Sequence, residues 1–134
     1  MEGIPVDVIP CIQRKVRIPE DQRMLLGGTE KALGRDDYVG EEIDDRMGKF
    51  RLHFGPVNAK QFQTLLPGGE SSDRLAFLTK YYVTDGLEYD VEITLAAGEA
   101  QCVCLGWPEW SRLGLTSWIF STEDLGEATI RFYL

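Results

Sequence analysis

Hydrophobic and polar positions alternate most regularly in the second half of the chain. The odd-numbered residues from 87 to 95 are apolar, and the even-numbered residues from 88 to 94 are acidic except for one threonine. This alternation predicts a strand over residues 87–96, with one face in the core and the other face wet and acidic. Shorter runs of the same kind predict strands at 4–10, 11–18, 38–44, 49–54, 101–105, 117–120 and 128–134.

Two helices are predicted between the strands at 49–54 and 87–96. Asn58 is a suitable N-cap for the first helix, over residues 59–66. The second helix begins after Ser71 or Ser72, extends through about residue 83, and has apolar residues on two neighbouring stripes. These residues are Leu75, Leu78 and Tyr82 on one stripe, and Phe77 and Tyr81 on the other. So much apolar surface predicts a helix that is largely buried against the sheet.

A similar series of short motifs occurs twice. In each copy, two Leu-Gly pairs are followed by an aromatic residue and a β-branched residue. These motifs lie at 26–27, 33–34 and 38–39, and again at 105–106, 113–114 and 118–119. Upstream, residues 3–8 parallel residues 86–91, and downstream residues 48–54 parallel residues 127–133 less closely.

The repetition predicts a duplicated β-rich unit. The single domain 1–134 would then contain two pseudo-repeats, 3–57 and 86–134, joined by helices within 58–84, with a protruding loop in each repeat. The expected fold class is α+β. Chance similarity between strands bounded by glycine remains the alternative.

Composition and net charge limit the classes of molecule that we expect the chain to bind. The chain has 134 residues, 43% of them hydrophobic, and a net charge of −8. Such a charge argues against nucleic acid or an anionic membrane as the partner. No apolar run is long enough to span a bilayer, and no signal peptide is recognisable. Cys11, Cys102 and Cys104 form a poor disulfide framework, which indicates reduced thiols and a cytosolic protein.

Candidate catalytic groups are few, and we expect no catalytic residue, metal or cofactor. Acidic pairs at 36–37, 41–42 and 44–45 are better explained as a solvated face or turns than as a cation site. His53 is the only histidine and lies opposite the apolar face of its strand. A hydrolase using Asp44, Asp45 and His53, or a β-rich module that encloses a small ligand, remains the alternative to a protein-binding scaffold.

Two short segments are distinctive: Lys49-Phe50-Arg51 and the run Leu113-Gly114-Leu115-Thr116-Ser117-Trp118. They resemble the TssG (ImpH/VasB) family of type VI secretion baseplate proteins. Other similar segments lie at 33–40, 45–48, 54–56 and 65–69, in the same order. Family members are longer, so the chain is expected to be a C-terminal portion. It departs from the pattern at Phe120, where glycine is expected.

The resemblance implies a structural role and no catalysis. TssG-like proteins join two TssF-like chains and one TssE-like chain in a baseplate wedge, in a bacterial cytoplasmic assembly docked on the membrane. They also bind a trimeric TssK-like adaptor. Our hypothesis is that residues 19–38 and 97–116 form two adaptor-binding loops, here called the first and second foot loops. Their expected apolar anchors are Leu25, Leu26, Leu33, Trp107, Trp110 and Leu113. Trp118, in a strand, is expected in the core.

Overall fold

The computed structural model describes residues 3–23, 39–102, 106, 110–119 and 126–134. The chain forms two compact units, one made of residues 1–10 and 50–134 and the other of residues 11–49. The first unit contains a four-stranded sheet and two helices, and the second contains a two-stranded sheet. The expected α+β class is therefore confirmed. No helix in the described residues is long and apolar enough to cross a membrane.

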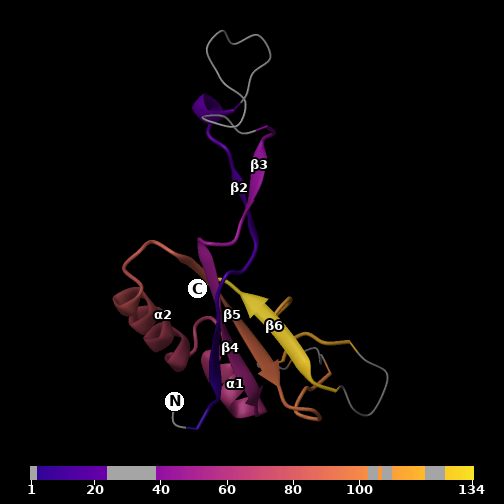
Figure 1. Cartoon of the computed structure of the whole chain (residues 1–134). Coiled ribbons are helices and arrows are strands. Elements are labelled where there is room, and N and C mark those ends of the chain that lie inside the picture. Colours follow the sequence, from indigo (N-terminus) through magenta and orange to yellow (C-terminus); the bar gives the residue numbers. More distant parts are fainter. Residues whose placement is uncertain (1–2, 24–38, 103–105, 107–109, 120–125) are drawn as a thin grey trace. The chain divides into compact units, whose positions relative to one another are not determined.

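The sheet of the first unit has the strand order β1-β4-β5-β6 (Figure 1). Its strands are β1 (Val6–Ile9), β4 (Lys49–Val57), β5 (Glu88–Leu95) and β6 (Ala128–Phe132). β1 is antiparallel to β4, and β5 is antiparallel to β6. Contacts between β4 and β5 advance in the same direction along both strands, from Arg51 with Asp90 to Val57 with Ala96. These central strands are thus parallel, which a long connection through helices allows.

Helices α1 (Ala59–Leu65) and α2 (Glu70–Tyr82) connect β4 to β5. Asn58 caps α1 as predicted: its side chain accepts a hydrogen bond from the Gln61 amide, and the Gln61 side chain accepts one from the Asn58 amide. β4 extends beyond residue 54, where the predicted strand ended, and the carbonyl of Val57 still accepts a bond of 2.9 Å from the amide of Ala96. The strand predicted at 117–120 is reduced, in its described part, to a bridge between Trp118 and Cys102.

The hydrophobic core lies between the helices and one face of the sheet. Phe62 and Leu65 of α1 are fully buried against the central strands. The sheet contributes the alternating apolar residues of three strands, as their patterns predicted. They are Leu52 and Phe54 of β4, Val91, Ile93 and Leu95 of β5, and Ala128, Ile130 and Phe132 of β6.

The opposite face of the sheet carries a network of ion pairs. Arg51 donates two hydrogen bonds to Asp90, at 2.6 and 3.0 Å, and lies 3.4 Å from Glu92, which also pairs with Arg131. The hydrogen bond to Asp90 raises the pKa of Arg51. Asp90 and Glu92 are only 4% and 9% exposed, so the expectation of a wet acidic face is wrong here. The arginines that cover these carboxylates come from neighbouring strands, which the pattern of β5 alone does not reveal.

β1 forms one edge of the sheet. The carbonyl of Pro5 accepts a bond from the Gly55 amide, so every second residue from Pro5 directs its backbone toward β4. Val6 and Val8 therefore direct their amides and carbonyls away from β4, and both side chains are exposed. The strand lies between Pro5 and Pro10, and Pro10 lacks an amide hydrogen at the next outward position. Pro10 thereby ends the outward hydrogen-bonding edge of β1 on its C-terminal side.

The registers of the two antiparallel pairs bear on one detail of the alignment behind the predicted duplication, which itself stays a prediction. Val8 lies opposite Leu52 and Val91 lies opposite Phe132. Aligning residues 48–54 with 127–133 matches Leu52 to Arg131, which lies on the other face of the sheet. Shifting the second segment by one residue restores the apolar match of Leu52 to Phe132. A shift of one residue exchanges the two faces of a strand.

The second unit is built on β2 (Arg14–Arg17) and β3 (Glu42–Asp45), which pair in antiparallel register. Arg14 binds Asp45 at 2.8 Å. A Cβ atom at Gly48 would lie 1.9 Å from the Arg14 guanidinium, so glycine leaves room for this pair. A short 3-10 helix, η1 (Glu20–Gln22), follows β2. β2 and β3 thus lie largely within the strands predicted at 11–18 and 38–44.

We predict that Gly55→Ala destabilises the protein by at least about 1–3 kcal/mol, the usual cost of such a backbone conformation for a residue with a side chain. Gly55 has a φ of +146°, and a Cβ atom there would lie 2.7 Å from the carbonyl oxygen of Thr94. Urea unfolding measures the effect. Gly126→Ala is the matched control, because no atom lies within 4 Å of its added Cβ. Equal stability of the two variants would contradict the prediction.

Candidate functional site

The turn at residues 112–116 closes on itself through hydrogen bonds. The amides of Leu115 and Thr116 donate to the carbonyl of Arg112, at 3.1 and 2.9 Å. The amide of Arg112 donates in return to the hydroxyl of Thr116 at 3.0 Å. Gly114 has a φ of +78°, which glycine adopts without strain. Thr116 is fully buried, so the turn has a fixed base.

Aromatic packing attaches this turn to α1. The ring of Trp110 stacks on Phe62, with centroids 6.2 Å apart and planes 5° from parallel. Trp118, on the other side of the turn, contacts both rings at 5.6 and 5.9 Å. The guanidinium of Arg112 also donates to the carbonyl of Pro67 at 3.1 Å. The two ends of the turn are therefore held against the helical part of the first unit.

The fixed turn displays a large apolar side chain. Leu113 is 93% exposed although the residues on both sides of the turn are packed. Ile119, next to the partly buried Trp118, is exposed as well. Sequence reasoning did not select Ile119. The signal was present, because residues adjacent in an extended segment point in opposite directions.

The predicted anchors differ in how exposed they are in the structure. Leu113 is exposed as a contact residue must be. Trp110 is only 3% exposed and belongs to the core, so its selection as an exposed anchor is wrong. Trp118 packs against the core as expected. The remaining anchors, Leu25, Leu26, Leu33 and Trp107, lie outside the described residues.

The acidic groups considered for catalysis are engaged in local structure. Asp45 accepts a bond of 2.8 Å from the Met47 amide and another from Arg14, and these bonds lower its pKa below the ordinary value of 3.8. Asp44 lies opposite Lys15 in the ladder. The Nε2 atom of His53 lies 3.1 Å from the hydroxyl of Thr94. No cluster of three potential metal ligands occurs in the part of the chain that the structure describes.

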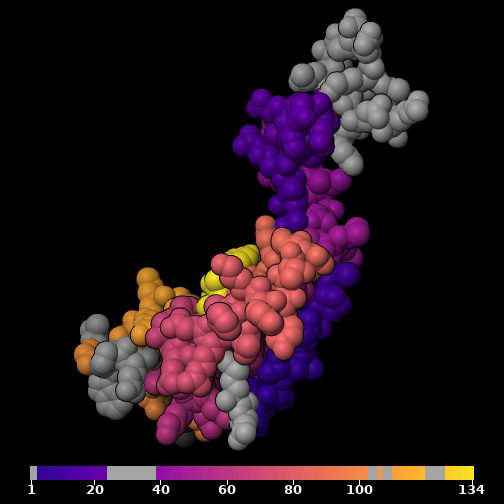
Figure 2. Space-filling view, turned by 90° about the vertical axis from the view of Figure 1, so that its left-hand side faces the viewer, coloured from indigo at the N-terminus to yellow at the C-terminus, as the bar shows by residue number. Residues whose placement is uncertain are grey.

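A second exposed apolar surface lies on α2. Its inner face buries Ser72, Leu75 and Thr79, but most of its large side chains point outward. Figure 2 shows α2 uncovered on the face toward the viewer. The expectation of a largely buried helix is therefore wrong for this side. The exposed residues are Phe77, Leu78, Tyr81 and Tyr82.

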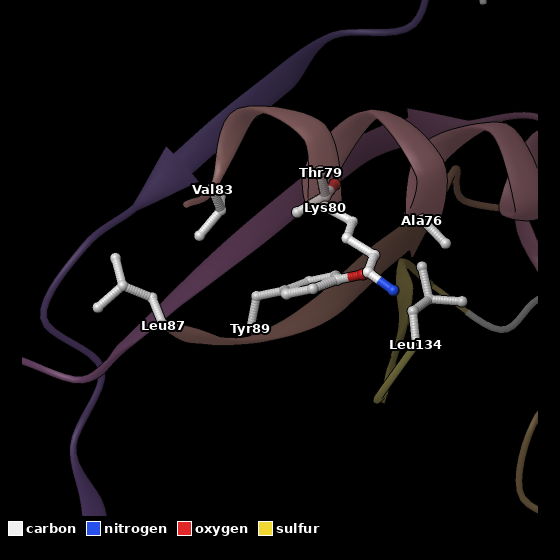
Figure 3. A pocket seen from close by; sticks show the side chains of 7 residues that line it. All are labelled: Ala76, Thr79, Lys80, Val83, Leu87, Tyr89 and Leu134. Carbon is white, nitrogen blue, oxygen red and sulfur yellow. The ribbon is translucent and has the colours of Figure 1, made fainter. Parts of the chain in front are cut away.

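A cavity of about 330 Å³ lies along the inner side of α2. Figure 3 shows Val83 facing Leu87 at one end, Ala76 near Leu134 at the other, and the Lys80 side chain extending toward Tyr89 between them. Its walls are mostly apolar, and Asp44, Asp45 and His53 do not line it. The cavity therefore gives no support to the acid-based hydrolase.

Comparison with known proteins identifies the family. The sequence model described as "Type VI secretion, TssG" matches residues 1–119, which is most of the chain. This chain belongs to the TssG family. No match was found among curated proteins. The earlier resemblance is thus confirmed for the family itself.

Two solved structures share the fold of this TssG-family chain. One is described as a TssK-TssF-TssG baseplate subcomplex of the type VI secretion system, with a TM-score of 0.72 and 19% identity over 98% of this chain. The other is a baseplate complex of the same system, with a TM-score of 0.59 and 18% identity over 96%. The chain spans 57% and 37% of the lengths of those two chains. At these identities, the comparison shows the fold.

We predict that Trp110→Ala destabilises the protein by about 3–5 kcal/mol, because it removes a buried aromatic ring and leaves a cavity beside Phe62. Leu113→Ala is the matched control and is expected to change stability by no more than about 0.5 kcal/mol. Urea unfolding with intrinsic fluorescence measures both. A destabilised Leu113 variant would contradict the exposure of Leu113, and a neutral Trp110 variant would contradict the burial of Trp110.

We also predict that Arg14→Gln raises the pKa of Asp45 part of the way to 3.8, since the Met47 amide bond remains. Because the pKa of this carboxyl is lower in the folded turn, its ionised form stabilises the turn at pH values above the ordinary pKa. This contribution disappears as the pH falls through the lowered pKa. Carboxyl NMR titration measures the shift. Lys15→Gln is the control, because Lys15 pairs with Glu42 instead. An unchanged Asp45 titration in Arg14→Gln would exclude the ion pair as a cause.

Proposed function

We propose that this chain is a structural component of a type VI secretion baseplate, in a cytoplasmic assembly docked on the bacterial membrane. It scaffolds TssF- and TssE-like subunits and binds a TssK-like adaptor through its two foot loops. Membership of the TssG family supports this role. A structure of similar fold comes from a complex that contains TssK and TssF together with TssG.

The observation that carries the adaptor-binding proposal is the display of Leu113. A leucine that is 93% exposed does not destabilise the folded chain, but it does not contribute to the core either. Here it stands on a turn fixed by the burial of Thr116 and the packing of Trp110. Because the backbone of the turn is already fixed, covering Leu113 requires little further ordering of the chain, which favours a role as a protein-binding anchor.

The strand arrangement supports a pair of foot loops. β1 and β4 form one antiparallel pair, and β5 and β6 form another. Between the strands of each pair lies a long excursion of the chain, residues 10–48 in the first and 96–127 in the second. Each excursion contains one foot loop. Two similar excursions suit the binding of two copies of one partner, which would strengthen attachment through avidity.

The foot-loop residues divide into two roles under this proposal. Trp110 positions the second foot loop from inside the core. The contact residues are Leu25, Leu26, Leu33, Trp107 and Leu113. This assignment replaces the simpler expectation that all six apolar residues touch the adaptor.

We predict that Leu113→Asp weakens binding of the purified TssK-like trimer from the same organism by at least about tenfold at the second foot loop. When the adaptor covers this position, the carboxylate of the new aspartate loses its hydration, which opposes binding. Calorimetry and mass photometry measure affinity and stoichiometry, and two trimers per wild-type chain are expected to become one. Met47→Asp is the control, since Met47 is equally exposed but lies outside both foot loops. A wild-type chain that binds no trimer would overturn the proposal.

A further inference from the structure

The hydrogen bonds of the turn at residues 112–116 converge on one residue, Arg112. Its carbonyl accepts bonds from the amides of Leu115 and Thr116, and its own amide donates to the Thr116 hydroxyl at 3.0 Å. Thr116 is fully buried, so this group of bonds is attached to the core at one end. The backbone of Arg112 is therefore held by the end of the turn that follows it.

The side chain of Arg112 attaches the turn to a distant part of the chain. Its Nη1 atom donates to the carbonyl of Pro67 at 3.1 Å, across 45 residues of sequence. Among the residues that the structure describes, no other side-chain hydrogen bond joins residues 110–119 to the rest of the chain. The rings of Trp110 and Trp118 are held by packing, which is not directional, whereas a hydrogen bond restricts both distance and angle.

Pro67 belongs to a closely packed connection between α1 and α2. It follows Leu66, which is only 2% exposed and whose carbonyl accepts a bond of 2.8 Å from the amide of Gly69. A Cβ atom at Gly69 would lie 2.3 Å from the carbonyl oxygen of Thr64, so the connection runs directly against the end of α1. The carbonyl that binds Arg112 is therefore a firm point of attachment.

The direction of Leu113 depends on these two attachments of Arg112. Leu113 is the next residue and is 93% exposed, so it has almost no packing of its own to hold it. Gly114, on its other side, has a φ of +78° and lacks the side chain that would restrict its backbone. Fixing Arg112 in the free chain removes freedom that the adaptor would otherwise have to remove when it binds.

The exposed guanidinium of Arg112 admits two roles, contact with the adaptor or positioning of its neighbour. A charge at the rim of an interface acts mainly on the association rate and makes binding sensitive to salt. A residue that orders its neighbour has neither effect, and its influence disappears when that neighbour is removed. The bond from Arg112 to a carbonyl of its own chain favours positioning.

We propose that Arg112 is a positioning residue for adaptor binding. Through its bonds to Thr116 and Pro67 it fixes the direction of Leu113, and it makes no contact with the TssK-like trimer itself. This inference rests on the proposed function, which makes Leu113 an anchor of the second foot loop. It adds that this loop is ordered in the free chain, before the adaptor is bound.

The first test examines the free chain. Arg112→Met keeps an unbranched stem but removes the donor, whereas Arg112→Lys keeps a donor for Pro67. NMR relaxation should give the Leu113 amide an order parameter of about 0.85 in the wild type and in Arg112→Lys, and below about 0.6 in Arg112→Met. Arg74→Met is the matched control, because Arg74 is an exposed arginine of α2. Unchanged order in the folded Arg112→Met variant overturns the inference.

The second test measures binding of the purified TssK-like trimer from the same organism by calorimetry, at the site that Leu113→Asp weakens. Arg112→Met is expected to weaken this site about fivefold, the usual effect of losing one hydrogen bond, and Arg112→Lys to stay within about twofold of wild type. In a Leu113→Ala background, Arg112→Met should change the affinity less than about twofold, since no anchor remains to be positioned. Its salt dependence should match that of Arg74→Met, which loses the same charge outside the foot loops.

The outcomes distinguish failure of this inference from failure of the proposed function. Equal effects of Arg112→Met with and without Leu113, or a weaker salt dependence than that of Arg74→Met, indicate direct contact. Either result overturns the inference and leaves the adaptor-binding proposal standing, as does full affinity of Arg112→Met. A wild-type chain that binds no trimer overturns the proposed function and this inference with it. Circular dichroism checks that each variant is folded.

Discussion

The stack of Trp110 on Phe62 connects parts of the chain that are almost fifty residues apart. Phe62 is fully buried beneath the sheet, and Trp110 and Trp118 complete the packing around it. Removing either side of the stack would expose apolar surface on α1 and release the base of the turn. The same contact therefore completes the core and fixes the direction in which Leu113 points.

Much of the fold follows from short-range patterns. The alternation over residues 87–95 specifies β5, and Asn58 with Gln61 specifies the start of α1, because both signals are local. The continuation of β4 past Gly55 depends on a hydrogen bond to Ala96, which is distant in sequence. The burial of Asp90 depends likewise on Arg51, from a neighbouring strand. Partners of this kind become visible only in three dimensions.

The exposed apolar residues were harder to predict than the strands and helices. The sequence shows which residues are apolar, but it does not show which other residues cover them. Trp110 and Leu113 belong to the same short segment, yet the first is buried and the second exposed. The apolar excess of α2 suggested burial within the chain. The structure shows that only one side of α2 is covered, so the apolar residues of this helix are divided between the core and an exposed face.

The proline at the end of β1 has a consequence for aggregation. An open strand edge with exposed valines is a template for fibril growth, because any extended chain can add to it. Pro10 ends that template on its C-terminal side, because it offers no amide hydrogen at the next outward position after Val6 and Val8. An edge that ends so soon after Val8 offers an added strand few hydrogen bonds, which limits fibril growth from this side of the sheet.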